Sequence, residues 1–356
     1  MNQALKKLLK YSSYVLITVG LIYVLVAIIL VYIGPFTTLL VKHRLKNKPV
    51  DIIVSLTTTP YRIDTIKPVL DGIFKQSIKP TRVYVNVPYI FKRENREYVI
   101  PEWLKSYPNI IINRTKDYGP GTKLIATLEK EDEPNTVIIT FDDDKIYPKH
   151  VVRDLVNQYL SDPSSNNKAI TGLGLGALFL QDFDVSRPHP YFYYIDFDNS
   201  LLVVGATAVL YKRNFFGKDI FSLLDNVSNG CFLSDDLMIS AYLIANNIDI
   251  VPASGVSYKL MFDDLRVPLL TSLTDDSLEY GTKTAGNRAN YSLCVGSLPK
   301  DNRYKISLLS KSRFVFDTFQ SEWFSVAMSR LYYRYYLTGF INIMPFVKKI
   351  YIKVMG

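Results

Sequence analysis

The sequence contains only two cysteines and three histidines among its 356 residues. Cys231 and Cys294 can make at most one disulfide, and without a CxxC spacing they indicate neither a disulfide framework nor a thiolate zinc site. The histidines lack metal-ligand spacing, and neither a Walker loop nor a Gly-x-Ser-x-Gly elbow is present. The usual sequence signals for a zinc centre, a P-loop nucleotide site and a serine hydrolase are therefore missing.

Nucleic-acid-binding motifs are missing as well. The chain has 42 Lys and Arg residues against 33 Asp and Glu residues, which gives a formal net charge of +9. This charge suits contact with a membrane, a nucleic acid or a phosphorylated substrate. The basic residues are scattered, apart from clusters beside the N-terminal apolar run and in the tail, and no zinc-finger, RNA-recognition or basic-zipper signature is present. We therefore expect no nucleic acid as a partner.

The N-terminal segment has no charged residue from Tyr11 to Val41. Its apolar core is long enough to cross the roughly 30 Å of bilayer hydrocarbon as a helix. A cleaved signal peptide would have a shorter apolar region and a small-residue cleavage site, whereas Tyr14 and Phe36 have the positions of interfacial anchors. We predict a retained transmembrane helix over 13–36, and hence a single-pass membrane protein with the lipid bilayer as a partner.

Lysine and arginine residues flank this helix on both sides, so the positive-inside rule does not choose the side on which the rest of the chain lies. The tail is aromatic and basic, which fits either a segment along the membrane interface or a final helix packed on the core. The predicted organisation is a short basic N-terminus (1–12), a transmembrane helix (13–36), a basic juxtamembrane linker (37–49), a catalytic domain (50–300) and a helical tail (301–356).

After Pro49, short β-branched runs alternate with amphipathic stretches. This alternation predicts an α/β fold with a doubly wound, mostly parallel sheet and helices on both faces. In such sheets, ligands bind outside the carboxyl ends of the strands. We expect strands at 50–56, 82–87, 109–113 and 136–141 and helices at 63–76 and 123–130, followed by glycine-containing strands at 169–179 and 201–211, an aromatic and acidic segment at 188–199 and a helix at 234–246.

Three adjacent carboxylates, Asp142, Asp143 and Asp144, directly follow the fourth of these runs. Because adjacent carboxylates repel one another, this arrangement is costly beside a crevice unless a cation or solvent screens it. Magnesium and manganese accept carboxylate oxygens and keep positions for phosphate oxygens and water. An Asp-x-Asp pair can thus hold a metal against a diphosphate; the alternative is an acidic turn that caps the next helix.

A second acidic site lies at Ser234, Asp235 and Asp236, directly before an apolar stretch. A serine at the N-cap and aspartates in the first turn would simply complement the helix dipole. Together with a metal-diphosphate site, however, the pair offers a carboxylate base that takes a proton from an acceptor hydroxyl. Both interpretations are kept.

Two polar turns follow other predicted strands. The segment from Tyr118 to Lys123 contains Gly119 and Gly121 and opens a helix, so its backbone N–H groups and the lysine can approach phosphates. The Thr-rich turn after the first run offers hydroxyl groups and Arg62 to a nucleotide. Ordinary hydrogen-bonded turn chemistry is the alternative for both segments.

The motifs at 53–63, 116–124, 138–144, 209–216 and 234–237 together resemble the family 2-like glycosyltransferases with the GT-A fold. The resemblance spans roughly residues 50 to 260. It implies a nucleotide-sugar donor, an Mn²⁺ or Mg²⁺ ion and inversion at the anomeric carbon. The resemblance also assigns the metal to Asp142 and Asp144, a ribose or metal neighbour to Asp143, and catalysis to Asp236 with Asp235 beside it. Together with the two polar turns, the expected donor-binding residues are Thr57, Thr58, Arg62, Asp117, Gly119, Gly121, Lys123, Asp142 and Asp143.

Two departures refine this prediction. The second acidic motif is Asp-Asp where Glu-Asp is commoner, so either Asp235 or Asp236 is the base. The Gln-x-x-Arg-Trp motif of processive synthases is missing, which favours a non-processive enzyme that transfers sugar to a hydroxyl of a glycan, lipid or protein. The alternatives are a sugar-phosphate nucleotidyltransferase, although the loop after the first run is Thr-rich where that class has glycine-rich basic loops, and an inactive membrane-tethered nucleotide-binding scaffold.

Overall fold

The computed structural model describes residues 35–172, 174–176, 201–203, 205, 208–226, 228–253, 290, 293–294 and 296–299, together with Tyr14 and Thr18. The tail at 301–356, the segment at 188–199 and nearly all of the expected transmembrane helix at 13–36 lie outside these residues. Within them, no helix is both long and apolar enough to cross a membrane.

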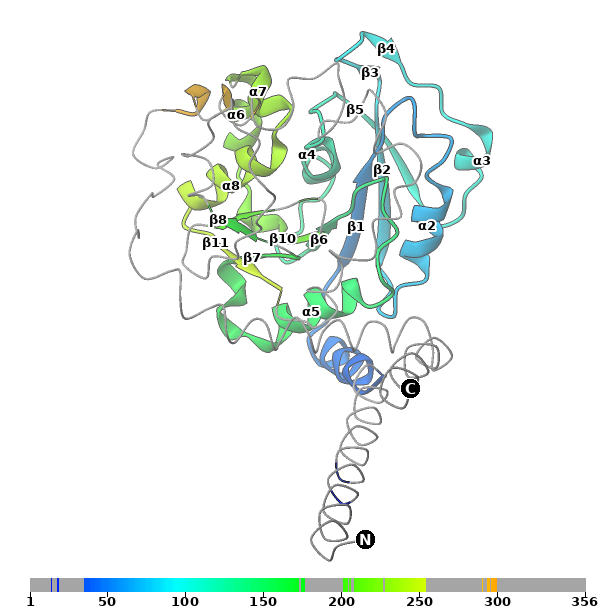
Figure 1. Cartoon of the computed structure of the whole chain (residues 1–356), viewed down its shortest axis with the longest axis vertical. Coiled ribbons are helices and arrows are strands. Elements are labelled where there is room, and N and C mark those ends of the chain that lie inside the picture. The colour runs from blue at the N-terminus through cyan, green and yellow to red at the C-terminus, as the bar shows by residue number, and fades with distance from the viewer. Residues whose placement is uncertain are drawn as a thin grey trace, which may run out of the picture.

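The centre of the fold is a seven-stranded sheet with the order β11-β7-β10-β6-β1-β2-β5 (Figure 1). β1 pairs in parallel with β2 and β6, and β2 pairs in parallel with β5. β10 runs antiparallel between β6 and β7, and β11 is parallel to β7. The predicted mostly parallel sheet is therefore confirmed. Its strands are β1 (Ile52–Thr57), β2 (Arg82–Pro88), β5 (Ile111–Thr115), β6 (Val137–Thr140), β7 (Lys168–Thr171), β10 (Val209–Lys212) and β11 (Asp249–Pro252).

Helices pack on both faces of this sheet because successive strand residues point to opposite sides. Val54 belongs to one buried core together with residues of α2 and α5, whereas Ile53 belongs to a second core together with residues of α4 and α8. The helices are α2 (Lys67–Phe74), α3 (Glu102–Lys105), α4 (Thr122–Leu128), α5 (Val151–Ser161), α6 (Asp219–Asn226), α7 (Asn229–Phe232) and α8 (Asp235–Ala245), with 3₁₀ helices at Pro163–Asn167 and Arg213–Phe215.

The elements of the first half match their predicted positions closely. All four β-branched runs form strands of the central sheet, and the helix expected at 234–246 is α8. The helix expected at 63–76 begins later, at Lys67, because a proline stands in its first turn and the preceding residues form turns.

The two glycine-containing runs of the second half each divide into two strands. The first gives β7 of the main sheet and then β8 (Gly174–Gly176), and the second gives β9 (Leu201–Val203) and then β10. β8 and β9 form a separate antiparallel pair. Between β9 and β10, Ala208 adopts a φ of 66°, a left-handed conformation that ends the extended run. A single strand over each run was therefore a wrong prediction.

One hairpin was not predicted at all. β3 (Ile90–Phe91) and β4 (Arg96–Glu97) pair antiparallel after β2, and Asn95 takes a φ of 49° in the connecting turn. Strands of two residues carry too little alternation to be recognised from sequence. The hairpin stands at the end of the sheet where β2 and β5 finish (Figure 1).

The segment expected as a linker at 37–49 is mostly helical, as part of a helix over 35–47. Val41 on this helix is fully buried in the core that includes α5. Arg44 Nη1 donates to Asn157 Oδ1 on α5 at 2.8 Å. This helix is thus joined to the domain just before β1, at the end of the sheet opposite the β3–β4 hairpin (Figure 1).

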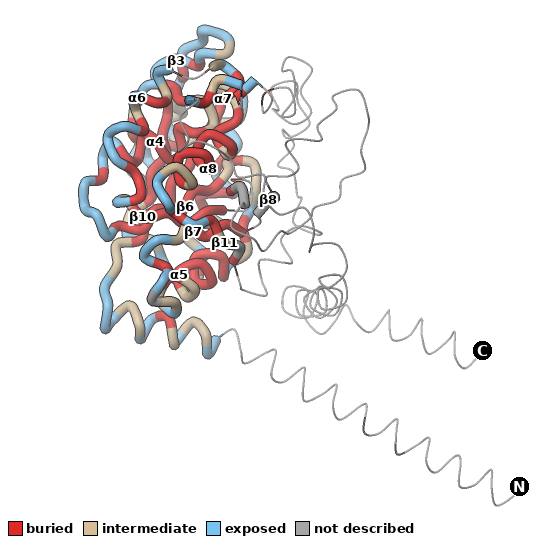
Figure 2. Tube along the Cα trace, turned by 90° about the vertical axis from the view of Figure 1, so that its left-hand side faces the viewer, coloured by how far each residue is buried: buried red, intermediate tan, exposed pale blue. Residues whose placement is uncertain are grey.

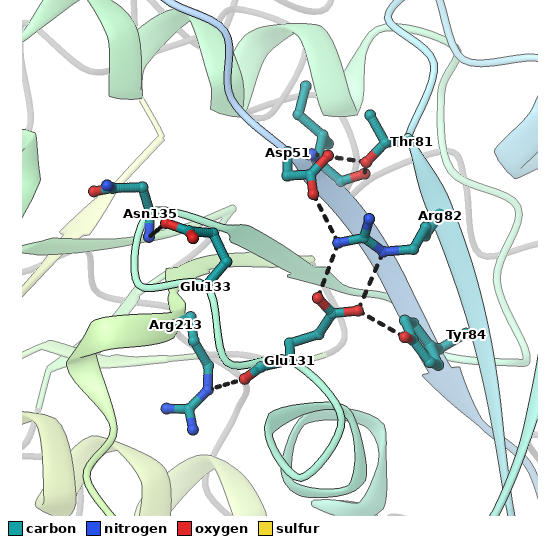
Figure 3. Close-up of polar contacts among 9 residues, drawn as sticks. Asp51, Thr81, Arg82, Tyr84, Glu131, Glu133, Asn135 and Arg213 are labelled. Atoms are coloured by element: carbon teal, nitrogen blue, oxygen red, sulfur yellow. Dashed lines mark hydrogen bonds and ion pairs between the residues drawn. The ribbon is translucent and has the colours of Figure 1, made fainter.

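A polar network fastens the amino end of the sheet (Figure 3). Arg82 Nη2 lies 2.7 Å from Asp51 Oδ2 and 2.9 Å from Glu131 Oε2, and Tyr84 Oη donates to Glu131 Oε1 at 2.6 Å. Arg213 donates to the backbone oxygen of Glu131. These groups satisfy one another's charges and hydrogen-bonding capacity, so we interpret the network as structural.

The two cysteines form a disulfide, the single one that two cysteines allow. Cys231 on α7 is joined to Cys294, and both are buried. The disulfide ties α7, which directly precedes α8, to a segment 63 residues further along the chain. Figure 2 shows how fully the strands and the helices over them are buried.

Candidate functional site

Polar side chains gather where β1 and β6 end. The chain passes from β1 outward through β2 to β5 and then returns to place β6 on the other side of β1. At such a topological switch point the connections leave in opposite directions and open a crevice at the carboxyl ends of the strands. Thr58 follows β1 and Asp142 follows β6, so both residues lie at this position.

Arg62 binds two of the three clustered aspartates. Its Nε atom lies 3.1 Å from Asp143 Oδ2, and its Nη1 atom lies 3.2 Å from Asp144 Oδ2. Desolvation raises the pKa of the Asp143 carboxyl, while Arg62 and a hydrogen bond from Thr58 oppose this rise. The turn after β1 therefore supplies the counter-charge for the acidic cluster after β6.

Lys123 joins the two acidic motifs. Its Nζ atom lies 2.9 Å from Asp142 Oδ1 and 3.1 Å from Asp235 Oδ2, and its side chain is 8% exposed. Burial acts against its charge, but Asp142, Asp235 and Asp236 raise the pKa of the ammonium well above its ordinary value. A charged Lys123 thus holds the end of β6 and the first turn of α8 around one cation.

Asp236 lies beside this cation and has a distinct environment. Its Oδ1 atom accepts the backbone N–H of Gly205 at 2.9 Å. Desolvation and the neighbouring Asp235 carboxylate raise the pKa of Asp236 to about 8, although Lys123 and the Gly205 N–H act in the opposite direction. A carboxylate with a pKa near neutrality is well suited to accept a proton.

The backbone at Gly205 leaves no room for a side chain. A Cβ atom there would lie 2.6 Å from Lys123 Nζ and 2.8 Å from Asp236 Oδ1. This close approach explains why a glycine stands here. Sequence reasoning missed Gly205 as a site residue, because its partner is 31 positions away; the only available signal was a glycine inside an apolar run.

The outer carboxylates of the cluster differ in acidity. Desolvation and the charges of Asp142 and Asp143 raise the pKa of Asp144 to about 6. Desolvation acts in the same direction on Asp142, but Lys123, Lys145 and Arg62 together outweigh it and lower the pKa of that carboxyl. Asp142 is therefore the more acidic member of the Asp-x-Asp pair.

Tyr147 is a second site residue that the sequence did not indicate. Its hydroxyl accepts the backbone N–H of Asp142 at 3.0 Å, and its ring stacks on Phe141 with centroids 4.0 Å apart. The tyrosine thereby fixes the backbone at the start of the acidic cluster.

The glycine turn before α4 packs tightly against the second acidic motif. Gly119 has a φ of 63°, and a Cβ atom there would lie 2.2 Å from the backbone oxygen of Phe232 on α7. A Cβ atom at Gly121 lies 3.3 Å from Asp235 Cβ. Both glycines thus permit the close packing that directs Lys123 toward the carboxylates.

Asp117 shapes this turn from within. Its two carboxylate oxygens accept the backbone N–H groups of Gly119 and Lys92, each at 2.8 Å. The buried Asp117 therefore links the glycine turn to the β3–β4 hairpin. Thr57, expected near the nucleotide, donates its hydroxyl to the backbone oxygen of Asn86 at 2.8 Å.

Ser234 precedes α8 as the N-cap residue but makes no side-chain capping hydrogen bond. Its hydroxyl is buried without a hydrogen-bond partner. Asp235 and Asp236 both lie in the first turn of α8. The explanation of this motif as a helix N-cap is therefore incomplete. The aspartates lie in the first turn, but the serine hydroxyl does not cap the helix.

The acidic cluster fits a cation that is shared with a ligand. In the part of the chain that the structure describes, no three His, Cys, Asp or Glu residues are placed to hold a metal ion by themselves. Asp144 Oδ1 is buried without a hydrogen-bond partner, which suits a cation ligand. Mg²⁺ and Mn²⁺ are commonly bound by one or two carboxylates together with substrate phosphates, and the donor set fits this mode.

No protein-family model and no curated protein matches the sequence. Among solved structures, the chain is similar to S. aureus TarS 1–349, with a TM-score of 0.35, 14% identity and coverage of 59% of this chain and 63% of that chain. TarS 1–349 in complex with UDP-GlcNAc gives a TM-score of 0.36, 14% identity and coverage of 58% and 57%.

The galactosyltransferase LgtC in complex with donor and acceptor sugar analogs gives a TM-score of 0.34, 11% identity and coverage of 71% of this chain and 97% of that chain. The chain thus spans less than two thirds of the length of both TarS structures. At these TM-scores and identities, the similarities assign neither a family nor a substrate to this chain.

Proposed function

We propose that the protein is a membrane-anchored, metal-dependent glycosyltransferase that moves a sugar from a nucleotide-sugar donor to an acceptor hydroxyl. The observation that carries this proposal is the meeting of two acidic motifs, Asp142–Asp144 and Asp235–Asp236, around Lys123 at the switch point of the sheet. One motif suits a metal-bound diphosphate, and the other contains a carboxyl with a pKa of about 8. The proposed metal-dependent, inverting transfer uses both functions at one site.

In the proposed reaction, Asp236 accepts the proton of the acceptor hydroxyl as its oxygen attacks the anomeric carbon. Gly205 holds this carboxylate in position through its backbone N–H. Lys123 offers positive charge to the departing diphosphate. A divalent ion held by Asp142 and Asp144 would supply further charge stabilisation of the leaving group. Direct displacement of this kind inverts the anomeric configuration, and the missing Gln-x-x-Arg-Trp motif favours a non-processive enzyme.

The anchoring part of the proposal is supported by the helix over 35–47. The described part of this helix overlaps the end of the predicted membrane span and packs on α5, so it would connect the bilayer firmly to the domain. Phe36 and Leu39 on this helix are 66% and 65% exposed, as expected of residues at a membrane interface. The candidate site, at the opposite end of the sheet, would then face away from the bilayer.

A donor screen tests the proposed function. Release of nucleoside diphosphate is followed for the full chain with a panel of nucleotide sugars, with and without Mn²⁺. We expect release from one donor class, dependence on Mn²⁺ and loss of release in Asp142→Asn with Asp144→Asn. Release that is unchanged in this double variant at saturating Mn²⁺ would show that the metal assignment is wrong.

Two further assays separate the alternatives: pyrophosphate release from nucleoside triphosphates with sugar phosphates, and calorimetric nucleotide binding. A sugar-phosphate nucleotidyltransferase would release pyrophosphate from a nucleoside triphosphate and a sugar phosphate. An inactive scaffold would bind a nucleotide and release nothing. Either result would overturn the transferase proposal.

A further inference from the structure

Two arginines stack on two exposed tyrosines beside the candidate site. The guanidinium carbon of Arg96 lies 4.8 Å from the ring centroid of Tyr61, and that of Arg114 lies 4.9 Å from the ring centroid of Tyr89. Both tyrosines are exposed. The arginines belong to β4 and to the edge strand β5, and the tyrosines follow β1 and β2, so the four residues come from separate segments.

A stacked guanidinium keeps its hydrogen-bonding capacity. A guanidinium over an aromatic ring is held by cation–π attraction, and its N–H groups can still donate hydrogen bonds to an anion. No carboxylate of the described residues forms an ion pair with Arg96 or Arg114. The tyrosine rings restrict both side chains, so less conformational entropy is lost when an anion binds. Such a pair of arginines is suited to bidentate recognition of carboxylate or phosphate groups.

More positive charge lies nearby. The exposed Lys92 has its Nζ atom 5.3 Å from the ring centroid of Phe232, and the exposed Lys116 lies 5.4 Å from that of Tyr118. Lys116 also pairs with Asp225 at 2.6 Å, so its charge is partly compensated.

This surface is fixed rigidly to the candidate site. Tyr61 directly precedes Arg62, which binds two aspartates of the cluster. On the hairpin side, Tyr98 Oη donates to the backbone oxygen of Thr58 at 2.9 Å. Asp117 accepts the backbone N–H of Lys92 at 2.8 Å. A ligand on the hairpin therefore lies beside the turn that also contacts the reaction centre.

We propose that Tyr61, Tyr89, Arg96 and Arg114, here called the Arg–Tyr surface, bind the acceptor, and that this acceptor is a negatively charged glycan with carboxylate or phosphate groups. The inference rests on the proposed function, whose acceptor class it specifies. The anionic groups bind outside the reaction centre, so only a hydroxyl has to approach the acidic cluster. Anionic lipid is less suitable, because the hairpin and the 35–47 helix lie at opposite ends of the sheet (Figure 1).

Binding of matched polysaccharides tests this proposal. The full chain is placed in phosphatidylcholine nanodiscs and titrated with polygalacturonate and with the same polymer after methyl esterification. A second pair is phosphomannan and neutral mannan. We expect the charged member of at least one pair to bind at least tenfold more tightly than its neutral counterpart, and the preferred pair distinguishes carboxylate from phosphate recognition.

Variants locate the binding. Arg96→Gln with Arg114→Gln should weaken binding of the charged polymer at least tenfold, and Arg96→Lys with Arg114→Lys should restore only part of it, because lysine keeps the charge without the bidentate geometry. The charge-matched control is Lys75→Gln with Lys130→Gln, two exposed lysines elsewhere on the domain. This control should bind like the wild type.

Three results would overturn the proposal. The first is equal binding of charged and neutral polymers, and the second is an equal loss of polymer binding in the lysine control variant. The third is an arginine variant that still binds the polymer but no longer binds phosphatidylglycerol vesicles, which would assign the surface to lipid. Failure of the proposed function is seen separately, as absence of donor turnover in the wild type. The polymer titration contains no donor, so the two failures are distinguishable.

Discussion

The ε-ammonium group of Lys123 lies 2.9 Å from Asp142 Oδ1, in a position where it also reaches Asp235 on another element. The lysine lies in the first turn of α4, whereas Asp142 follows β6 and Asp235 begins α8. This single cation therefore brings together three segments that are far apart in the sequence. The geometry of the whole candidate site depends on it.

Replacing Lys123 by methionine should destabilise the fold. The side chain is almost fully buried between two carboxylates, and its loss leaves both without their counter-charge. Loss of one partner of a buried ion pair typically costs about 3 kcal/mol or more. Denaturant unfolding of Lys123→Met measures this change. Adding Asp235→Asn should recover part of it, whereas Lys130→Met at an exposed position should unfold like the wild type. Equal stability of both lysine variants would contradict this role.

Gly205→Ala should reduce transfer between about tenfold and a hundredfold, since small displacements of catalytic groups have effects of this size. The new Cβ atom would lie within 3 Å of both Lys123 Nζ and Asp236 Oδ1. The control is Gly296→Ala, where a Cβ atom meets nothing within 4 Å. Initial rates with the identified donor measure the effect. A rate equal to that of the control would show that Gly205 does not position the base.

The pH dependence of kcat/KM should report Asp236. The carboxyl must be deprotonated to act as a base, and its pKa is raised to about 8 by desolvation and Asp235. Lys123, Asp142 and the Gly205 N–H are the other groups that act on it. Activity should therefore rise with pH up to about 8 and then level off.

The contribution of Asp236 to folding stability should fall with pH, whereas activity rises. Because the pKa of folded Asp236 lies above its unfolded value, its contribution is fully present below about pH 4 and is lost as pH rises to about 8. Asp236→Asn should lack this pH-dependent change. A rate profile that is flat between pH 6 and 8 in the wild type would contradict a catalytic base with a pKa of about 8.

Reduction of the disulfide should lower thermal stability. Cys231 and Cys294 close a long loop, and opening a native disulfide typically costs about 2 to 4 kcal/mol. Melting of the wild type should therefore shift to lower temperature in dithiothreitol, while Cys231→Ser with Cys294→Ser should melt at that lower temperature with or without reductant. An unchanged Tm after thiol titration has verified reduction would contradict a stabilising role.

The sequence predicted the features that depend on local pattern. β-branched runs bounded by turn residues located β1, β2, β5 and β6, because strands buried on both faces are continuously apolar. The order of these runs predicted the parallel sheet, and with it the edge where Asp142 and Asp236 lie.

Contacts between residues far apart in the sequence could not be predicted from local sequence pattern. Nothing near Lys123 shows that its partners are carboxylates 19 and about a hundred positions further on. Likewise, the hydrogen bond from the Gly205 N–H to Asp236 joins residues 31 positions apart, which local pattern does not show. The roles assigned to individual site residues through the family resemblance remain predictions.

Calorimetric binding of UDP and GDP with and without Mn²⁺ tests the central claim most directly. If the acidic cluster holds a metal against a nucleoside diphosphate, one of these nucleotides should bind the full chain only when Mn²⁺ is present, and Asp142→Asn should weaken that binding at least tenfold. Equal binding without Mn²⁺ or in Asp142→Asn, or no binding of either nucleotide, would contradict the account.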